Sequence, residues 1–210
     1  MLPCPPLVAP IAALATLGAL AVPVLGGWAP LVGWDIAVSE RARAFGHDHP
    51  GWVGTLRIVT DLGATVPFLA VGVTLTVAFL LLARYGTAVG VGLVTALVPA
   101  AWGSGHVLLH RPRPVGGFVT TLSNGFPSGH TTNAAALAML GVLLLWSRLG
   151  RAGRLAAVAG AVLFAGTVGA TRVALLAHWP TDVLGGWLLG TALVPLCLAA
   201  GQLLGRSPDS

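Results

Sequence analysis

Long runs without a charged residue alternate along the chain with shorter segments that carry the charges. Each of six such runs contains 17 to 23 residues, and roughly 17–25 apolar residues are needed to cross the hydrocarbon core as a helix. Because irregular backbone cannot face lipid, the pattern predicts an all-α integral membrane bundle of six transmembrane helices. The predicted spans are Leu7–Leu25, Leu62–Ala83, Tyr85–Gly105, Thr131–Ser147, Leu155–Thr171 and Val183–Gly205.

The composition agrees with a membrane protein and excludes an ordinary soluble domain. Hydrophobic residues make up 56% of the chain and charged residues 8%, whereas soluble domains carry about 25% charged residues. The net charge of +5 arises from eleven Arg against six acidic residues. These Arg are scattered between apolar runs and form no basic stripe, so we expect the bilayer as a partner and no nucleic acid.

The basic residues also predict how the chain is oriented. If the spans alternate in direction, one side carries most of the Arg that have no acidic neighbour: Arg84, Arg148, Arg151, Arg154 and Arg206. The positive-inside rule then places this side and both termini in the cytoplasm, with a multi-pass chain in the cell membrane. The exterior side holds Gly26–Asp61, Leu109–His130 and Arg172–Asp182. The mixed charges of the first of these segments predict one or two short interfacial helices.

Several polar residues at the span ends of the exterior side are difficult to explain as filler. They are Arg113-Pro114 after the third span, Pro127-Ser128-Gly129-His130 before the fourth, and Arg172, His178 and Asp182 between the last two. Ionisable groups at such depths are costly and are functional candidates by default. If the bundle brings these ends together, the residues form one site.

The residue types in this set suit phosphoryl transfer. Guanidinium groups offer paired donors to phosphate oxygens, and the free N–H groups at a helix N-terminus attract an anion. Two histidines on separate segments supply a nucleophile and a proton donor. Asp182 follows His178 by four residues, so its carboxylate is expected to orient that imidazole, as the acid of a catalytic triad does.

Taken together, these motifs resemble the three-part signature of the type 2 phosphatidic acid phosphatase (PAP2) superfamily. The resemblance implies that His178 is the nucleophile, Asp182 its partner and His130 the group that protonates the leaving oxygen. It further implies that Arg113, Arg172, Ser128 and the Gly129 backbone hold the phosphate, without a metal or cofactor. The signature covers 106–182, within a single domain over residues 1–210.

One position departs from the family pattern. The first motif normally begins with Lys seven residues before the Arg of Arg-Pro, and here that position is His106. A protonated imidazole replaces an ammonium group in part, so we expect His106 to contribute to phosphate binding. His110, one helical turn later, is expected on the same face.

Other polar residues are given simpler interpretations. Arg111 is expected to face lipid headgroups, with a phosphate contact as the less favoured alternative. Asp35 and Asp61 are interpreted as charges at span boundaries. Trp102 and Trp187 are expected to pack or lie at the interface.

The expected function is therefore hydrolysis of a lipid phosphomonoester or pyrophosphate through a phosphohistidine. Polyprenyl pyrophosphate (undecaprenyl pyrophosphate among them), phosphatidylglycerol phosphate and phosphatidic acid all fit. The alternatives are a phosphatase of the same family acting on soluble sugar phosphates, a haloperoxidase-like protein that uses bound vanadate, and a catalytically silent lipid-binding or transport protein. The sequence leaves the oligomeric state open.

Overall fold

The chain folds into helices joined by short turns and one longer loop. The computed structural model describes residues 7–121 and 123–205, and these contain no β-strand. The helices are α1 (Val8–Leu25), α2 (Ala29–Asp48), α3 (Pro50–Thr60), α4 (Thr65–Leu81), α5 (Tyr85–Leu108), α6 (Gly129–Leu145), α7 (Arg151–Ala174) and α8 (Pro180–Leu204), with 3₁₀ turns η1 (Asp61–Gly63) and η2 (Trp146–Arg148). The predicted all-α architecture is confirmed.

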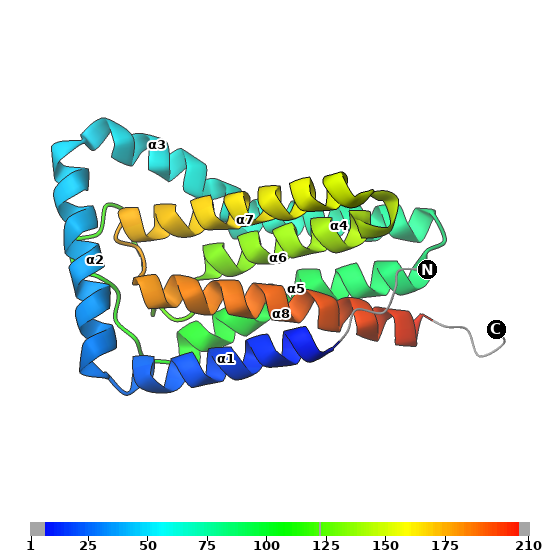
Figure 1. The fold of residues 1–210 in the computed structure, drawn as a ribbon, viewed down its shortest axis with the longest axis horizontal. Helices are drawn as coiled ribbons and strands as arrows, with labels where there is room; N and C mark the ends of the chain where they lie inside the picture. Colours follow the sequence, from blue (N-terminus) through cyan, green and yellow to red (C-terminus); the bar gives the residue numbers. More distant parts are fainter. Residues whose placement is uncertain (1–6, 122, 206–210) are drawn as a thin grey trace.

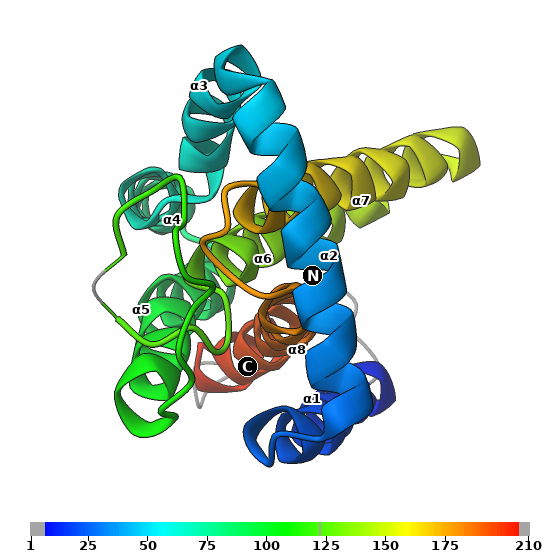
Figure 2. The ribbon, with the colours of Figure 1, turned by 90° about the vertical axis from the view of Figure 1, so that its left-hand side faces the viewer.

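Within the described residues, six segments are long and apolar enough to cross a membrane, as the sequence predicts. Five of them are α1, α5, α6 with η2, α7 and α8, and the sixth is Pro50–Leu81, which joins α3, η1 and α4. The remaining helix, α2, lies across one end of the bundle, roughly at right angles to the others (Figures 1 and 2). Two helices therefore occupy the segment where one or two were predicted, but α2 has 20 residues and α3 continues toward α4.

The helix ends differ from the predicted boundaries at the end of the bundle near α2. There α5 continues three residues beyond Gly105, α7 continues through Arg172, and α8 begins at Pro180. Charged residues set the predicted limits, yet helical hydrogen bonding continues past the hydrocarbon wherever polar side chains find partners. Several of the candidate site residues consequently lie within helix ends, where their backbone position is fixed.

α8 lies between α1, α5 and α6 in the centre of the bundle, and small residues allow its neighbours to approach closely. A Cβ atom at Gly186 would lie 2.8 Å from the Ser128 carbonyl oxygen, and one at Gly90 would lie 2.9 Å from the Leu198 Cα. Close approach at small residues increases the dispersion contacts that hold membrane helices together. This packing brings the start of α8 against the start of α6.

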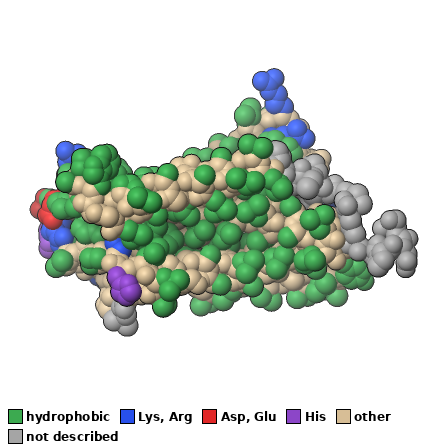
Figure 3. All heavy atoms as spheres, turned by 90° about the horizontal axis from the view of Figure 1, so that it is seen from below, with side chains coloured by type: hydrophobic (Ala, Val, Ile, Leu, Met, Phe, Trp, Pro, Cys, Tyr) green, Lys and Arg blue, Asp and Glu red, His purple; other side chains and the backbone are tan. Residues whose placement is uncertain are grey.

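Charged side chains gather at the two ends of the elongated molecule, while hydrophobic side chains cover its length (Figure 3). The start of α1 and the end of α8 lie at the end opposite to α2 (Figure 1). Arg84 and Arg148–Arg154 belong to the turns α4–α5 and α6–α7 or their flanks at that opposite end. Arg206 lies outside the described residues.

Candidate functional site

The three predicted motifs meet beneath α2, where the ends of four helices come together. The Ser128 N–H donates to the Asp182 carbonyl oxygen at 3.0 Å, which joins the start of α6 to that of α8. The Gly125 N–H donates to the Arg111 carbonyl oxygen at 2.8 Å, which folds the loop after α5 back on itself. Ser128 and Asp182 are both fully buried. Residues distant in the sequence thus form one buried polar cluster.

His178 is buried and both of its ring nitrogens have partners. Nδ1 lies 2.8 Å from the Gly125 carbonyl oxygen, and Nε2 lies 2.8 Å from Nη1 of Arg113. A carbonyl only accepts and a guanidinium only donates, so this pairing assigns the proton to Nδ1 and a lone pair to Nε2. Burial, followed by the positive charges of Arg113 and Arg172, holds the pKa of His178 well below its usual value. The imidazole is therefore neutral and nucleophilic at Nε2.

Asp182 lies beside His178, but the carboxylate is not its shortest contact. Oδ2 is 3.5 Å from Nδ1 of His178 and accepts the Trp179 N–H at 2.9 Å, while Oδ1 pairs with Arg111. The Gly125 carbonyl makes the shorter bond to Nδ1. The expected proximity of Asp182 is found, and the structure adds a main-chain acceptor that the sequence did not indicate.

Arg113 is held rigidly by main-chain carbonyl groups. Its guanidinium donates to the carbonyl oxygens of Ser123 at 2.7 Å, Asn124 at 3.0 Å and Ala177 at 2.6 Å. Burial lowers its pKa from the ordinary arginine value, which still leaves the group charged near neutral pH. The forked cation is thus oriented toward His178 before any ligand binds.

Arg172 approaches the same cluster from the end of α7 with fewer partners. Its side chain is buried, and Nη1 donates to the Thr60 hydroxyl at 3.1 Å. Among residues 7–121 and 123–205, its buried Nε has no hydrogen-bond partner. A buried N–H left unpaired is costly, and an anion oxygen is a natural acceptor for it.

His130 lies in the first turn of α6, where the leading N–H groups of a helix have no intrahelical acceptor. Its ring is half-buried and, within the described part of the chain, makes no hydrogen bond. It lies within electrostatic reach of Arg172, His178 and Arg113. The two imidazoles thus belong to the same end of the bundle and the same cluster.

Ser128 and Gly129 form the start of α6. Ser128 is the N-cap residue, and its hydroxyl accepts a hydrogen bond from the Thr131 hydroxyl at 2.9 Å. A Cβ atom at Gly129 would lie 2.9 Å from the Trp102 indole. Trp102 packs there and donates to the Asn133 side chain at 3.1 Å, which fits its expected packing role.

His106 lies in the cluster, with its ring centroid 6.2 Å from that of His178. Its Nε2 is 2.8 Å from the Pro127 carbonyl oxygen, and Nδ1 is 3.3 Å from the Ser123 hydroxyl. In its neutral form the His106 ring has one N–H, and this contact with the Pro127 carbonyl uses it when the proton is on Nε2. The expectation that His110 shares the face of His106 is wrong, because α5 ends at Leu108 and His110 is exposed.

The interpretations of Arg111 and Asp35 are also wrong. Arg111 does not face headgroups: it is buried, pairs with Asp182, and lies 2.5 Å from Asp35 Oδ2. Asp35, on α2, is buried rather than at a solvated boundary. It accepts the Thr181 N–H at 3.0 Å and the Thr181 hydroxyl at 2.7 Å. A three-member ionic network therefore underlies the start of α8.

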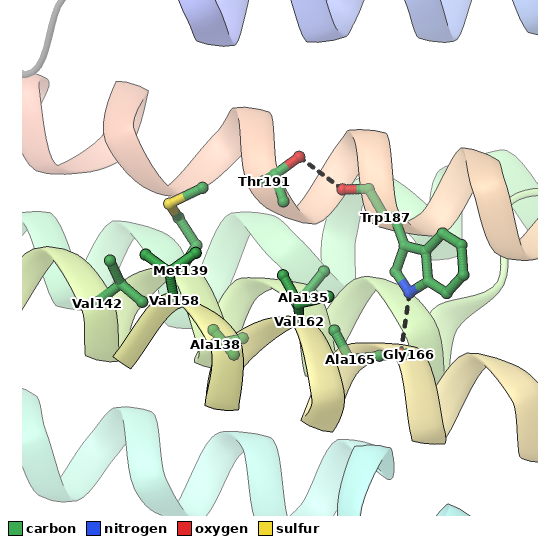
Figure 4. Close-up of a pocket in the computed structure, with 11 residues that line it drawn as sticks. Ala135, Ala138, Met139, Val142, Val158, Val162, Ala165, Gly166, Trp187 and Thr191 are labelled. Atoms are coloured by element: carbon green, nitrogen blue, oxygen red, sulfur yellow. Dashed lines mark hydrogen bonds between the residues drawn. The ribbon is translucent and has the colours of Figure 1, made fainter. Parts of the chain in front are cut away.

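Further along the bundle, an open apolar groove of about 300 Å³ lies between α6, α7 and α8, bounded by Met139, Val162 and Trp187 (Figure 4). Its lining contains no ionisable side chain, so the chemistry-bearing residues stay at the α2 end. The Trp187 indole donates to the Ala165 carbonyl oxygen at 3.0 Å, which agrees with packing. In the portion of the chain that the structure describes, no three His, Cys, Asp or Glu side chains group as a metal site.

Comparison with known proteins assigns the family. A sequence model of the PAP2 superfamily matches residues 87–206, which is more than half of the chain. The chain belongs to the PAP2 superfamily. The match includes every residue of the cluster except Asp35 and Thr60.

Individual relatives of this PAP2 chain carry phosphatase names. It is 42% identical over 77 residues to phosphatidylglycerophosphatase B of Escherichia coli K12 and of Shigella flexneri. The matched part spans 37% of this chain and 29% of those relatives. A crystal structure of a transmembrane PAP2 type phosphatidylglycerolphosphate phosphatase from Bacillus subtilis superposes with a TM-score of 0.79, covers 90% of this chain and 94% of that one, and is 26% identical.

Two features of this candidate site were not predicted from the sequence, for different reasons. A main-chain acceptor such as the Gly125 carbonyl leaves no mark in the sequence, because every residue carries one. Asp35 did leave a mark, since it is the only charged residue between Met1 and Ser39. A lone acid in so long an uncharged stretch is costly unless it is paired, which would have justified a search for its partner.

Proposed function

We propose that this PAP2 chain is a membrane phosphatase that removes phosphate from a lipid phosphomonoester or pyrophosphate through a phosphohistidine at His178. The observation that carries the proposal is the state of that imidazole. Its Nδ1–H is held by the Gly125 carbonyl and its Nε2 lone pair is directed at the Arg113 guanidinium. A neutral, oriented nucleophile beside a fixed cation is the arrangement that attack on a phosphate requires.

In the first half-reaction, Nε2 of His178 attacks phosphorus and the bond from phosphorus to the lipid oxygen breaks. His130 donates its proton to that oxygen, and the lipid leaves as an alcohol, or as a monophosphate when the substrate is a pyrophosphate. In the second, His130 takes a proton from water, which attacks the phosphohistidine. Inorganic phosphate leaves and His178 is restored.

The charged groups of the site have two separate tasks in this mechanism. Arg113 and Arg172 neutralise the phosphate oxygens, together with the N–H groups at the start of α6. In the bound state a phosphate oxygen takes the Arg113 N–H that Nε2 accepts in the free enzyme. Asp182 stabilises the positive charge that His178 acquires on attack.

A lipid substrate is supported by the position of the cluster at the helix ends of a six-span bundle. A phosphate held at this level keeps its hydrocarbon chains in the bilayer. The named relatives favour phosphatidylglycerol phosphate as the first substrate to test, ahead of polyprenyl pyrophosphate and phosphatidic acid. The Arg-rich turns at the opposite end favour a site on the exterior face, with both termini in the cytoplasm.

The test is phosphate release from these three lipids and from a sugar phosphate by purified protein in detergent with EDTA. We expect release from at least one lipid, little from the sugar phosphate, and loss of about 10⁴-fold or more in kcat in His178→Ala. His110→Ala, an exposed histidine beside the site, is the matched control and keeps the wild-type rate.

Three outcomes would overturn parts of the proposal. Absence of release from every lipid would reject the function, and equal hydrolysis of sugar phosphate would reject lipid selectivity. Activity that EDTA abolishes and Mg²⁺ restores would reject metal independence. Alkaline quenching after ³²P-labelled lipid should trap label on wild type but not on His178→Ala.

A further inference from the structure

The buried network at the start of α8 contains two acidic side chains, Asp35 and Asp182, and one cationic side chain, Arg111. Arg111 pairs through one N–H arm with Asp182 and through the other with Asp35, at 2.5 Å. The side chains of Asp182 and Asp35 are almost fully buried, and that of Arg111 is 10% exposed. A buried carboxylate without a partner is strongly unfavourable, and Arg111 is the cation that pairs with both acids.

A simple pair of Arg111 with Asp182 would nevertheless weaken the proposed role of Asp182. Such a pair has no net charge, and its field at His178 would be that of a dipole. With Asp35 included, the network has a net charge of −1. One full negative charge is then available near the imidazole, which becomes positive on attack.

We propose that Asp35 is a positioning residue that keeps the Asp35–Arg111–Asp182 network net negative and thereby supports the phosphohistidine chemistry. This inference rests on the proposed function. Asp35 does not touch the reacting atoms: it acts through Arg111 and through Thr181, whose N–H and hydroxyl it accepts at 3.0 and 2.7 Å. It also ties α2 to the first turn of α8.

Arg111 reaches His178 by a second route through the main chain. Its carbonyl oxygen accepts the Gly125 N–H at 2.8 Å, and the Gly125 carbonyl in turn holds Nδ1 of His178 at 2.8 Å. The side chain and the backbone of one residue therefore fix both neighbours of Nδ1, namely the carbonyl and the carboxylate. This explains why an arginine at this position is more useful inside the cluster than among headgroups.

The decisive variant is Asp35→Asn, because asparagine keeps an oxygen for the Thr181 N–H and removes the charge, although its NH2 group replaces the Oδ2 that accepts from Arg111 and the Thr181 hydroxyl. We expect kcat for the preferred lipid to fall on the order of tenfold, because the lost charge lies one residue beyond the groups that surround His178. KM should change less than threefold, since Arg113 and Arg172 hold the phosphate. Asp35→Glu, which retains the charge, should recover most of kcat.

The pH profile separates this electrostatic role from a purely structural one. The nucleophile must be deprotonated, so kcat/KM rises with pH through the pKa of His178. Removing a negative charge disfavours the cation and lowers that pKa further, so the acid limb of Asp35→Asn moves to lower pH by up to about one unit. The charged or titratable groups that face His178 and remain unchanged are Arg113, Arg172, His106, His130 and Asp182.

Two controls use the same region of the molecule. Glu40→Gln makes the same charge change on the exposed side of α2 and should leave kcat and the pH midpoint unchanged. Thr181→Val removes a hydrogen bond to Asp35 without a change of charge, so its midpoint should remain that of the wild type.

Failure of the proposed function and failure of the inference about Asp35 give different results. A wild type that releases no phosphate rejects the proposed function, whereas an active wild type with Asp35→Asn equal to it in kcat and midpoint rejects this inference. A fall in kcat with an unmoved midpoint, matched by Thr181→Val, assigns Asp35 a structural role and also rejects it. Because KM and the midpoint do not depend on the folded fraction, a partly folded variant is still informative. If Asp35→Asn yields no folded protein, Arg111→Gln replaces it: removal of the positive charge makes the network more negative, so the acid limb should move to higher pH, and an unchanged midpoint there would overturn the proposal.

Discussion

The two halves of the site differ in how completely the protein satisfies them. The anchored half, which consists of His178, Arg113 and Asp182, has its polar atoms held by carbonyl groups, N–H groups and Arg111. The open half consists of His130 and Arg172. Arg172 makes one bond, to Thr60, and leaves Nε unpaired among the residues described, and the His130 ring has no hydrogen bond within them.

This difference assigns the two halves different energetic roles. Groups that are already held lose no further freedom when a substrate binds, so in the proposed mechanism the anchored half would present His178 in its reactive geometry. Groups without partners gain theirs from the substrate, so the open half contributes to binding and to the departure of the leaving group. Substitutions in the two halves should therefore affect kcat, KM and leaving-group dependence in different ways.

Within the open half, the largest effect is expected from His130→Ala. Without the proton donor, kcat for a lipid alcohol leaving group should fall about 10²–10⁴-fold. A p-nitrophenyl phosphate substrate needs little protonation of its leaving oxygen, so the rate of its first half-reaction should fall much less. Burst kinetics on both substrates measure the first step separately, and equal losses would contradict the assignment of His130 as the acid.

The next largest effect is expected from Arg172→Lys. Lysine keeps the charge but lacks Nε and the fork, so removal of this donor should cost about 10²-fold in kcat/KM. Competitive inhibition by inorganic phosphate should weaken in parallel. Thr60→Val is the control, because it removes only the partner of Nη1. If Thr60→Val weakens inhibition by phosphate as much as Arg172→Lys does, the unpaired Nε is not the binding group.

A smaller effect is expected from Gly125→Ala in the anchored half. The added Cβ would lie 2.9 Å from Oδ2 of Asp182, so either this carboxylate or the Gly125 backbone, whose carbonyl holds His178, must shift. We expect kcat to fall about tenfold with KM nearly unchanged, as for a misplaced nucleophile. Gly103→Ala in α5, where nothing lies within 4 Å of the new Cβ, should keep the wild-type kcat. A Gly125→Ala effect confined to KM would reverse the distinction between the two halves.

The spans were predictable because membrane crossing leaves a signal that each segment carries by itself. Length and the lack of charge locate six runs, and the Gly186/Gly190 spacing permits the close packing that α8 shows against α6. Helix ends were less accessible to prediction. The charges at Arg172 and Asp182 suggested boundaries there, although buried partners allow both residues to stay inside helices.

The site was predictable only where side chains are diagnostic. His130, His178, Arg113 and Arg172 are distinctive in an apolar chain, so their convergence could be inferred. The partners of Arg111 could not, because Asp35 lies 76 residues away and nothing local links them. The Gly125 carbonyl was inaccessible in principle, since its role depends on where the loop after α5 folds back.

The smallest effect is expected from His106→Lys, at the border between the two halves. Histidine is the side chain that changes between a charged and a neutral form around neutral pH. Its positive charge is therefore lost as pH rises, whereas lysine stays charged and can still donate to the Pro127 carbonyl. Activity should be retained or rise within about threefold, and the fall in rate from pH 6 to 8 should flatten. His106→Gln, which is neutral throughout, should give a flat profile at a lower level. A folded but inactive His106→Lys would mean that the contacts of the ring with Pro127 and Ser123, rather than its charge, are what the anchored half requires.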